Sequence, residues 1–263
     1  KTVAQWQSLE ELDLGATNIS SKGMAELRRL PRLRSLVVPK AIDDAGLTEV
    51  AALENITMLW IDGRWSPSRS PLTAAGFDRL SSLTELRELR LDHLPIGNDE
   101  IAFISRLRRL TRLSLSETIV SDAGLSHLAG LQELEWLDLT RTQVTGRGFE
   151  ELASMSQLRR LDLSRAPVSD RGLKRIAVLT NLETLDLDGT KITDEGLVHL
   201  KAMGNLQSLN IISTAVSDAG LPYLEELSSI ELFHHDQTNT TAAGIARLED
   251  AWRERRDRKR SVE

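Results

Sequence analysis

The sequence contains no cysteine, which excludes disulfide bonds and metal sites built from thiolates. It also has no run of 18 apolar residues, so it predicts no membrane-spanning helix. Aromatic residues make up only 4% of the 263 residues. The formal net charge of -6 gives no reason to expect nucleic acid as a general partner. With 27% charged and 40% hydrophobic residues, the composition is typical of a water-soluble globular protein.

The dominant feature of the sequence is an internal repeat that begins Leu-x-x-Leu-x-Leu. Ten such segments fill nearly the entire chain, and the steps between them are 24, 23 and 30 residues and then 24 residues six times. Self-similarity at a fixed period indicates a repeat architecture. The repeats start at Leu9, Leu33, Ile56, Leu86, Leu110, Leu134, Leu158, Leu182, Leu206 and Ile230.

Each repeat predicts one strand and one short helix, as residues 182–205 illustrate with the sequence LETLDLDGTKITDEGLVHLKAMGN. Apolar and polar residues alternate over residues 184–188, which is the pattern of a strand with one buried face. Thr193 is the expected helix N-cap, and the apolar residues that follow recur at three-residue spacing from Leu197 to Leu200. One strand and one helix cannot bury a core alone, so the repeats must stack to form a continuous core.

Two further positions recur in nine of the ten repeats: a capping Ser, Thr or Asp before the helix, and a Gly three residues after it. Repeat four departs at both positions, with Gly97 and Glu100. Because glycine inside a helix costs about 1 kcal/mol relative to Ala, its recurrence indicates a close backbone approach at this point. The predicted caps are Ser20, Asp43, Thr73, Ser121, Thr145, Ser169, Thr193, Ser217 and Thr241.

These units resemble the leucine-rich repeat, in a subtype reading LxxLxLxxTxITDxGLxxLxxL that is found in many bacterial leucine-rich-repeat proteins. A more distant similarity links them to F-box-type repeats, which usually carry cysteine and are longer. The resemblance covers the whole chain and implies a curved α/β solenoid, a horseshoe with a parallel sheet on its concave side and short helices on its convex side. Thr stands where other subtypes place an asparagine ladder, and its hydroxyl can satisfy backbone groups of the loop.

We expect a single leucine-rich-repeat domain over residues 1–263. Within it, residues 1–8 would form a partial repeat or an N-terminal cap, residues 9–248 the ten repeats, and residues 249–263 a capping helix with a basic tail. Trp6 would serve either as that cap or as the remnant of a longer array.

The C-terminal segment favours a capping helix because Ile245, Leu248 and Trp252 share one helical face. The sequence RERRDRKR follows over residues 253–260. It is either a solvated helix end or a contact for an anionic partner. The first residue is Lys1 rather than Met, and the sequence assigns no compartment.

Three apolar residues occupy outward strand positions in repeats two and three. On this type of fold, such positions usually carry the function. Val37, Met58 and Trp60 are therefore expected to be exposed together on a surface that meets water. A Trp flanked by Val and Met is a candidate binding hot spot, unless the N-terminal cap or an insertion folds over it.

Repeat three contains six extra residues within the stretch IDGRWSPSRSPLTAAGF, residues 61–77. Its strand and helix are intact, so the extra residues are expected to form a loop on one rim of the horseshoe. The loop carries residue types favoured at interfaces, and we expect a partner to dock across repeats two to four. Tolerated sequence drift is the alternative explanation. The predicted partner-binding residues here are Val37, Met58, Trp60, Asp62, Arg64, Trp65, Arg69 and Arg90.

A second candidate surface is a ladder of acidic residues in repeats six to eight. Its aspartates stand on adjacent strands about 5 Å apart, where like charges repel each other. A basic partner would relieve the repulsion, and so would the neighbouring Arg141, Arg160 and Arg165. A solvated or internally neutralised ladder is the alternative. The candidate partner-binding residues are Trp136, Asp138, Asp162 and Asp186.

Enzymatic activity is not predicted, because no motif places a nucleophile beside a base and no glycine-rich phosphate loop is present. His234 and Asp236, near Asn210, could hold a divalent ion only weakly, so we predict neither a metal nor a cofactor. The sequence therefore predicts a non-catalytic module that binds a protein of unknown identity. The alternative is a targeting or scaffold domain cut from a larger multidomain protein, such as a bacterial effector or substrate receptor. No oligomeric state is assigned.

Overall fold

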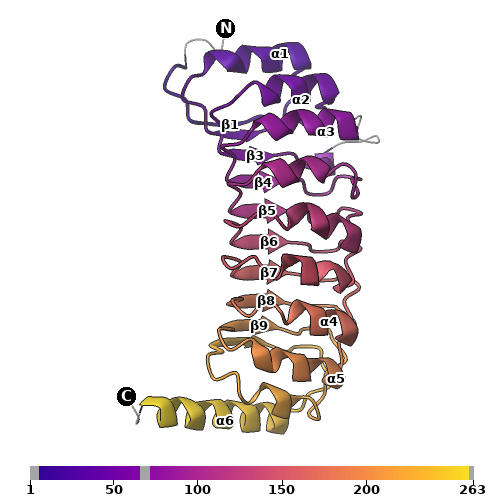
Figure 1. The fold of residues 1–263 in the computed structure, drawn as a ribbon, viewed down its shortest axis with the longest axis vertical. Coiled ribbons are helices and arrows are strands. Elements are labelled where there is room, and N and C mark those ends of the chain that lie inside the picture. Colours follow the sequence, from indigo (N-terminus) through magenta and orange to yellow (C-terminus); the bar gives the residue numbers. More distant parts are fainter. Residues whose placement is uncertain (1–5, 66–71, 261–263) are drawn as a thin grey trace. The chain divides into compact units, whose positions relative to one another are not determined.

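The computed structural model describes residues 6–65 and 72–260, which fall into two compact units, Lys1–Glu135 and Trp136–Glu263. Each unit consists of a layer of short parallel strands and a layer of short helices packed on one face of those strands (Figure 1). The opposite face of the strands, termed the strand face below, carries the outward side chains of the Leu-x-Leu motif.

In the N-terminal unit, five strands pair in sequence order and in parallel. Successive central leucines lie opposite one another, from Leu12 on the first strand to Leu113 on the last. The strands are β1 (Glu11–Asp13), β2 (Ser35–Val37), β3 (Met58–Trp60), β4 (Glu88–Arg90) and β5 (Arg112–Ser114). The helices are α1 (Ser21–Ala25), η2 (Glu26–Arg29), α2 (Asp44–Ala51), η3 (Gly63–Trp65), α3 (Ala74–Arg79), η4 (Leu80–Ser82), η5 (Ala102–Arg106) and η6 (Asp122–Leu128), where η denotes a 3-10 helix.

The C-terminal unit repeats this arrangement and ends in a long helix. Its strands are β6 (Trp136–Asp138), β7 (Arg160–Asp162), β8 (Thr184–Asp186), β9 (Ser208–Asn210) and β10 (Leu232–His234). Its helices are η7 (Arg147–Leu152), α4 (Asp170–Ile176), α5 (Asp194–Leu197), η8 (Val198–Ala202), η9 (Leu221–Leu224) and α6 (Ala242–Arg260). All ten strands lie where the repeat predicts them, and several of the predicted helices are 3-10 rather than α.

The core of each unit is built from the leucines of the repeat. Leu185 and Leu187 are fully buried at 0% exposure, whereas Asp186 between them is half-buried and faces outward. The predicted alternation along the strand is therefore confirmed. Phe77 and Phe103 add a stacked pair beneath the helices of the N-terminal unit, with ring centroids 6.0 Å apart.

Threonine after the strand satisfies a backbone carbonyl, as the sequence predicts. Its hydroxyl donates to the carbonyl oxygen three residues earlier, at 2.7 Å in every case. A hydroxyl that bonds locally in this way removes the cost of a buried, unpaired carbonyl. The six residues are Thr17, Thr118, Thr142, Thr190, Thr214 and Thr238.

The helix starts are joined from repeat to repeat by a side-chain contact that the sequence analysis missed. The Asp that follows a predicted cap accepts two hydrogen bonds, from the backbone N–H and from the hydroxyl of the cap in the next repeat. Asp194, for example, accepts from Ser217 N and Ser217 Oγ, both at 2.7 Å. We call each such contact a rung. Rungs also run from Asp44 to Thr73, Asp170 to Thr193 and Asp218 to Thr241.

At four of the recurring glycines, a rung Asp rather than backbone occupies the space of a Cβ. A Cβ added at Gly196 would lie 2.3 Å from Oδ1 of Asp170, so the carboxylate of the preceding repeat occupies the space. Gly76, Gly220 and Gly244 meet a rung Asp in the same way. The predicted backbone approach holds at Gly172, where an added Cβ would lie 2.1 Å from the Thr145 carbonyl oxygen.

The insertion of repeat three leaves the repeat around it intact. Strand β3 ends at Trp60, η3 follows, and α3 begins after Thr73, whose hydroxyl accepts from Gly76 N at 3.3 Å. The rung from Asp44 to Thr73 spans 29 residues, against 23 elsewhere in the chain, yet its bonds of 2.9 and 2.6 Å match the others. The extra residues therefore fall between strand and helix, as predicted.

A left-handed turn follows each strand from repeat four to repeat ten. One residue per turn has a positive φ of 52–63°, and only one of the seven is glycine. In five of the seven turns the backbone N–H of the positive-φ residue donates to the carbonyl 23 residues later, as Arg141 N does to Ser164 O at 2.8 Å. In four of the seven, the N–H two residues past an outward Asp or Asn also bonds back to that side chain, as Thr140 N does to Asp138 Oδ1 at 2.9 Å. The residues are His93, Glu117, Arg141, Arg165, Gly189, Ser213 and Gln237.

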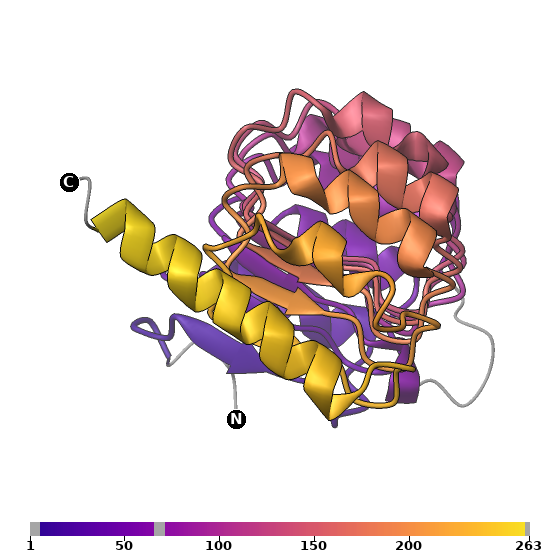
Figure 2. The same ribbon diagram turned by 90° about the horizontal axis from the view of Figure 1, so that it is seen from below.

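Helix α6 covers the end of the C-terminal unit (Figure 2). Ile245, Leu248 and Trp252 are buried at 8%, 2% and 4% exposure, and the Trp252 indole N–H donates to the Leu224 carbonyl at 2.8 Å. The ring of Phe233 meets the Trp252 ring edge-on at 5.5 Å. These three apolar residues share one helical face, and that face packs on the core.

Candidate functional site

The apolar candidates of the N-terminal unit lie side by side on the strand face. Val37 on β2 is opposite Trp60 on β3, and Met58 is opposite Ser35, whose hydroxyl contacts the Met58 sulfur at 3.7 Å. All three predicted residues are half-buried, so they meet solvent with only part of their side chains. The physical reason is lateral packing, because each side chain shields its neighbour on the next strand.

Trp60 is held on its other side by a charged residue. The Arg90 guanidinium carbon lies 5.6 Å from the centre of the Trp60 ring, which is cation–π geometry. Arg90 Nε in turn donates to Glu88 at 2.7 Å. The Trp60 indole N–H is shielded from solvent, and no residue in the described part of the chain accepts its hydrogen bond. A buried donor without an acceptor is uncommon and calls for a functional or structural explanation.

The rim residues next to β3 pair with each other. The Arg64 guanidinium donates several hydrogen bonds to the Asp62 carboxylate, the shortest at 3.0 Å, and this carboxylate raises the pKa of Arg64 above its usual value. The Arg64 side chain is 55% exposed, whereas that of Asp62 is only 8% exposed. Asp62 therefore serves to position Arg64.

Two of the predicted loop residues lie wholly or partly outside the described part of the structure. Trp65 closes η3, but its side chain lies outside the described part of the structure, as does the whole of Arg69. Gly63 fixes the start of the rim, because an added Cβ there would lie 2.1 Å from the His93 carbonyl oxygen. The chain therefore leaves β3 in close contact with the next repeat.

The acidic ladder of the C-terminal unit is confirmed in its register, since Asp138 lies opposite Asp162 and Asp162 opposite Asp186. Each carboxylate accepts a backbone N–H two residues further on, at 2.8–2.9 Å. Asp186 also accepts from the Ser164 hydroxyl at 2.8 Å and the Asn210 amide at 2.9 Å. Hydrogen bonds from nearby donors thus compensate the stacked charges.

Asp162, at the centre of the ladder, is affected by the charges on both sides. Burial raises the pKa of Asp162 above its usual value, and the charges of Asp186 and Asp138 raise it further, against the hydrogen bonds from Ser164. Of the arginines expected to neutralise the ladder, Arg165 pairs instead with Asp188 at 3.5 Å. Trp136 is half-buried and lies opposite Arg160 on the next strand.

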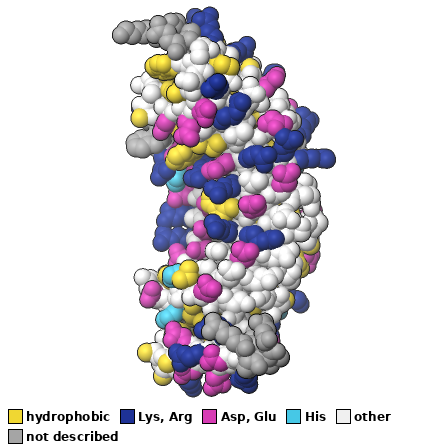
Figure 3. Space-filling view, turned by 90° about the vertical axis from the view of Figure 1, so that its left-hand side faces the viewer, with side chains coloured by type: hydrophobic (Ala, Val, Ile, Leu, Met, Phe, Trp, Pro, Cys, Tyr) yellow, Lys and Arg dark blue, Asp and Glu magenta, His cyan; other side chains and the backbone are white. Residues whose placement is uncertain are grey.

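The predicted residues whose side chains the structure describes thus form two groups, one in each unit. Charged side chains of both signs are interspersed on the view in Figure 3, and the apolar groups there are small. Sequence reasoning missed Glu88, which fixes Arg90 over Trp60. Its signal was available, because Glu88 and Arg90 occupy alternate residues of one strand and so share a face.

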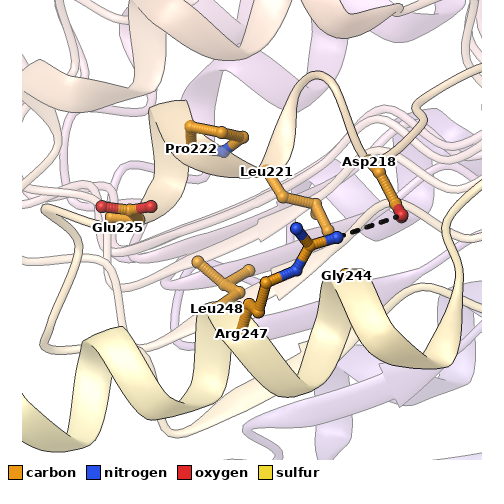
Figure 4. A pocket seen from close by; sticks show the side chains of 7 residues that line it. All are labelled: Asp218, Leu221, Pro222, Glu225, Gly244, Arg247 and Leu248. Carbon is orange, nitrogen blue, oxygen red and sulfur yellow. Dashed lines mark ion pairs between the residues drawn. The ribbon is translucent and has the colours of Figure 1, made fainter.

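Other kinds of site are poorly supported in the described residues. They contain no cluster of three or more His, Asp or Glu side chains placed to hold a metal ion. None of their helices is long and apolar enough to cross a membrane. A small pocket beneath α6 is lined by Leu221, Pro222 and Leu248, and Arg247 points across it toward Asp218 at 3.8 Å (Figure 4). Its polar groups are already engaged, since Asp218 forms the last rung.

Comparison with known proteins identifies the repeat. The family described as Leucine Rich repeat matches residues 7–27, 155–177 and 178–200. The fold is similar to that of an internalin from Listeria monocytogenes, with a TM-score of 0.66 and 19% identity, over 85% of this chain and 67% of that one. It is also similar to internalin C2 from the same organism, with a TM-score of 0.60 and 25% identity, over 81% and 83%. No curated protein matches the chain.

These findings show that the chain contains leucine-rich repeats and has the fold of a leucine-rich-repeat solenoid. The predicted fold class, the α/β leucine-rich-repeat solenoid, is confirmed by the parallel strands, the short helices and the similarity to internalins. Proteins of this class are in general protein-interaction modules. The particular subtype and the relation to F-box repeats stay predictions.

Proposed function

We propose that this protein is a non-catalytic binding module that holds a protein partner on the strand face and on the rim loop of repeat three. The observation that carries the proposal is Trp60. It is a half-buried aromatic residue on a face that no helix covers, and its indole N–H has no acceptor among the described residues. Binding hot spots are enriched in Trp, Tyr and Arg.

The surroundings of Trp60 favour a partner that carries both apolar and acidic groups. Val37 and Met58 offer an apolar contact, and Arg64, which follows β3, is more than half exposed. Asp62 and Glu88 hold the two arginines in fixed positions, so less side-chain entropy is lost on binding. Trp65 and Arg69 of the rim loop would extend this contact, and the rigid strands keep the anchors in place.

The acidic ladder would form a second contact, for a basic segment of the partner. Asp138, Asp162 and Asp186 each keep a carboxylate on the strand face, and Trp136 lies at its edge. The raised pKa of Asp162 indicates that an approaching cation would stabilise the charged form.

The similarity to Listeria internalins supports a bacterial source.

The test compares partner capture by the wild type with capture by a Trp60→Ala, Trp65→Ala double variant. Tyr223→Ala is the matched control, because it removes an exposed aromatic from η9 on the helix side. A purified partner should lose about 30-fold in affinity in the double variant and keep its affinity in the control. Equal affinity for all three proteins would disprove the proposed site.

The ladder is tested separately with Asp138→Asn and Asp162→Asn in one protein. If it attracts a basic segment, the variant should bind more weakly, and its affinity should depend less on salt, because screening acts beyond about 8 Å at physiological ionic strength. Unchanged affinity and unchanged salt dependence would leave the ladder as a structural element only.

A second candidate function is that of a targeting or scaffold domain in a larger protein, such as a bacterial effector or substrate receptor. The observation that favours it is that the match covers only 67% of the first internalin chain, so similar solenoids occur within longer chains. Fusion of this chain to a reporter enzyme separates the two functions. A targeting domain would relocate the reporter in cells, and a simple binding module would not.

A further inference from the structure

Three exposed apolar side chains lie on neighbouring helices of the C-terminal unit, in the layer opposite the strand face (Figure 1). Val178 directly after α4 is 39% exposed, and Val198 on η8 and Tyr223 on η9 are each 37% exposed. They belong to successive repeats, and η8 packs on both α4 and η9. Single exposed apolar residues are ordinary, but a group on adjacent elements indicates a contact surface. We call these three residues the helix-side patch.

The helix-side patch is peculiar to repeats seven to nine. In repeats one to six, the three corresponding positions carry small, polar or charged residues, apart from Phe103, which is buried. Thr48 in repeat two and Ser126 in repeat five, for example, stand where repeat eight has Val198. Because other repeats stack with polar residues at these positions, the core does not require apolar ones there. The patch therefore calls for an explanation outside the repeat itself.

Basic side chains border the patch on α4 and η8. Arg171, Lys174 and Lys201 are exposed, and none of the three makes an ion pair with a residue that the structure describes. Lys201 Nζ lies 5.9 Å from the centre of the Tyr223 ring and so links η8 to η9. Arg175 on the same helix as Lys174 is already engaged, because it pairs with Glu150 at 2.5 Å. The three remaining cations favour an acidic partner.

Acidic side chains border the patch at two other points. Glu195 on α5 and Glu226 after η9 are exposed and likewise make no ion pair with a described residue. Glu225 is engaged, because it pairs with Arg255 at 3.9 Å. The charge of this surface thus changes from basic at α4 to acidic after η9. Acidic groups of a partner are therefore expected over α4 and η8 rather than over the end of η9.

The spacing of the patch suits a helical partner. Helices of neighbouring repeats lie about 10 Å apart, and a helix that crosses them advances about 10.5 Å in seven residues. Side chains seven residues apart lie nearly on one face of a helix, so three of them can meet the three patch residues in turn. An extended segment advances about 10 Å in three residues, and side chains three residues apart point to opposite faces of a strand.

We propose that the helix side of repeats seven to nine binds an amphipathic helix of a partner protein. Apolar residues at seven-residue spacing on this helix contact Val178, Val198 and Tyr223, and acidic residues beside the first two pair with Arg171 and Lys174. Because the patch lies on the layer opposite the strand face, this site is separate from the proposed Trp60 surface.

The direct test uses the intact protein and a fluorescein-labelled helical peptide with leucine at three positions seven residues apart and glutamate beside the first two. One control peptide carries lysine in place of each glutamate, and a second has the same composition with the leucines spread around the helix. Fluorescence anisotropy should show at least about tenfold tighter binding of the first peptide than of either control. Equal affinity for the glutamate and lysine peptides, or for the aligned and spread leucines, would overturn the proposal.

Variants then locate the site. Val198→Asp should weaken binding of the glutamate peptide at least about tenfold, whereas Ser126→Asp, at the equivalent position of repeat five, should bind as the wild type does. Tyr223→Ala should also bind more weakly, and Trp60→Ala should not. Weaker binding in the Ser126 or Trp60 variant, or unchanged binding in the Val198 variant, would overturn the assignment to the patch.

A charge exchange separates recognition from misfolding. Arg171→Glu with Lys174→Glu should lose affinity for the glutamate peptide and gain affinity for the lysine peptide, which an unfolded protein would not do. Glu195→Lys should bind the glutamate peptide more tightly than the wild type, because it removes a repulsive charge. If the first variant keeps the preference of the wild type, the basic residues of α4 do not select the partner and the proposal fails.

Discussion

From Asp170 onward, each rung joins an Asp to a Ser or Thr 23 residues later, whereas the N-terminal unit varies both the spacing and the chemistry. Its Asp44 rung spans 29 residues, and its other rung uses Asn98 instead of Asp. Asn98 Oδ1 accepts from Ser121 N at 3.0 Å, and its amide donates to the Ser121 hydroxyl at 2.9 Å. The rung therefore tolerates changes in charge and in loop length. It is not required for stacking, because Ala74 and Gly146 stand in its place in repeats three and six without a side-chain acceptor, and their strands pair as the others do.

The largest effect is expected where a regular repeat is compared with the edge. Leu185→Ala should destabilise the protein by about 2–5 kcal/mol, because it removes a fully buried side chain and leaves a cavity. Leu12→Ala, at the equivalent half-buried position of β1, should cost less. Urea unfolding of both variants measures the difference, and equal losses would show that the edge is as well packed as the interior.

The second largest loss of stability is expected at the glycines that contact a rung Asp. Gly196→Ala should cost about 1–3 kcal/mol, because the new Cβ would overlap the Asp170 carboxylate and force it to move. Gly204→Ala is the control, since an added Cβ there meets nothing within 4 Å. A Gly196 variant as stable as the control in thermal unfolding would contradict the explanation of the recurring glycine.

Replacing a rung residue should have a somewhat smaller effect, and one that depends on the substitute. Asp194→Ala should cost about 1–2 kcal/mol, because it leaves the Ser217 N–H without its acceptor. Asp194→Asn should cost less than about 1 kcal/mol, because Asn98 already forms a working rung. If both variants unfold at the same urea concentration, the comparison between the two units fails.

The same contact predicts a dependence on pH. Hydrogen bonds from Thr241 lower the pKa of Asp218 below its usual 3.8. A lowered pKa in the folded state contributes stability above the usual value, and this stability is lost as the pH falls through the lowered one. Asp218→Asn should therefore flatten the stability curve of the protein in this acidic range. An unaltered pH profile would show that Asp218 makes no such contribution.

The smallest change in stability is expected for removal of residues 66–71. The rung from Asp44 to Thr73 and the strand β3 remain, so the free energy of unfolding should change by less than about 0.5 kcal/mol. Binding of a Trp60-dependent partner should fall. An unfolded protein would make the loop structural, and undiminished binding would make it irrelevant to the proposed function.

Much of the fold could be predicted from the sequence, because local periodicity determines it. The alternation around Leu185 and the position of Thr190 depend only on residues of one repeat. The burial of Trp60 and the pairing of Arg64 could not be predicted, because they depend on side chains that meet across strands and along the rim. The rungs could have been predicted from the sequence, because Asp recurs directly after the cap at positions 170, 194 and 218.

The left-handed turns after the strands keep one backbone conformation while the side chain at the positive φ differs from repeat to repeat. In five of the seven turns the backbone N–H of the positive-φ residue bonds to a carbonyl of the next repeat, so the side chain at that position contributes little to the geometry of the turn. That position carries His, Glu, Arg, Arg, Gly, Ser and Gln in successive repeats from four to ten. The rim is thus a set of sites whose chemistry can be exchanged while the scaffold stays constant, and selection or protein engineering can change specificity there without redesigning the core.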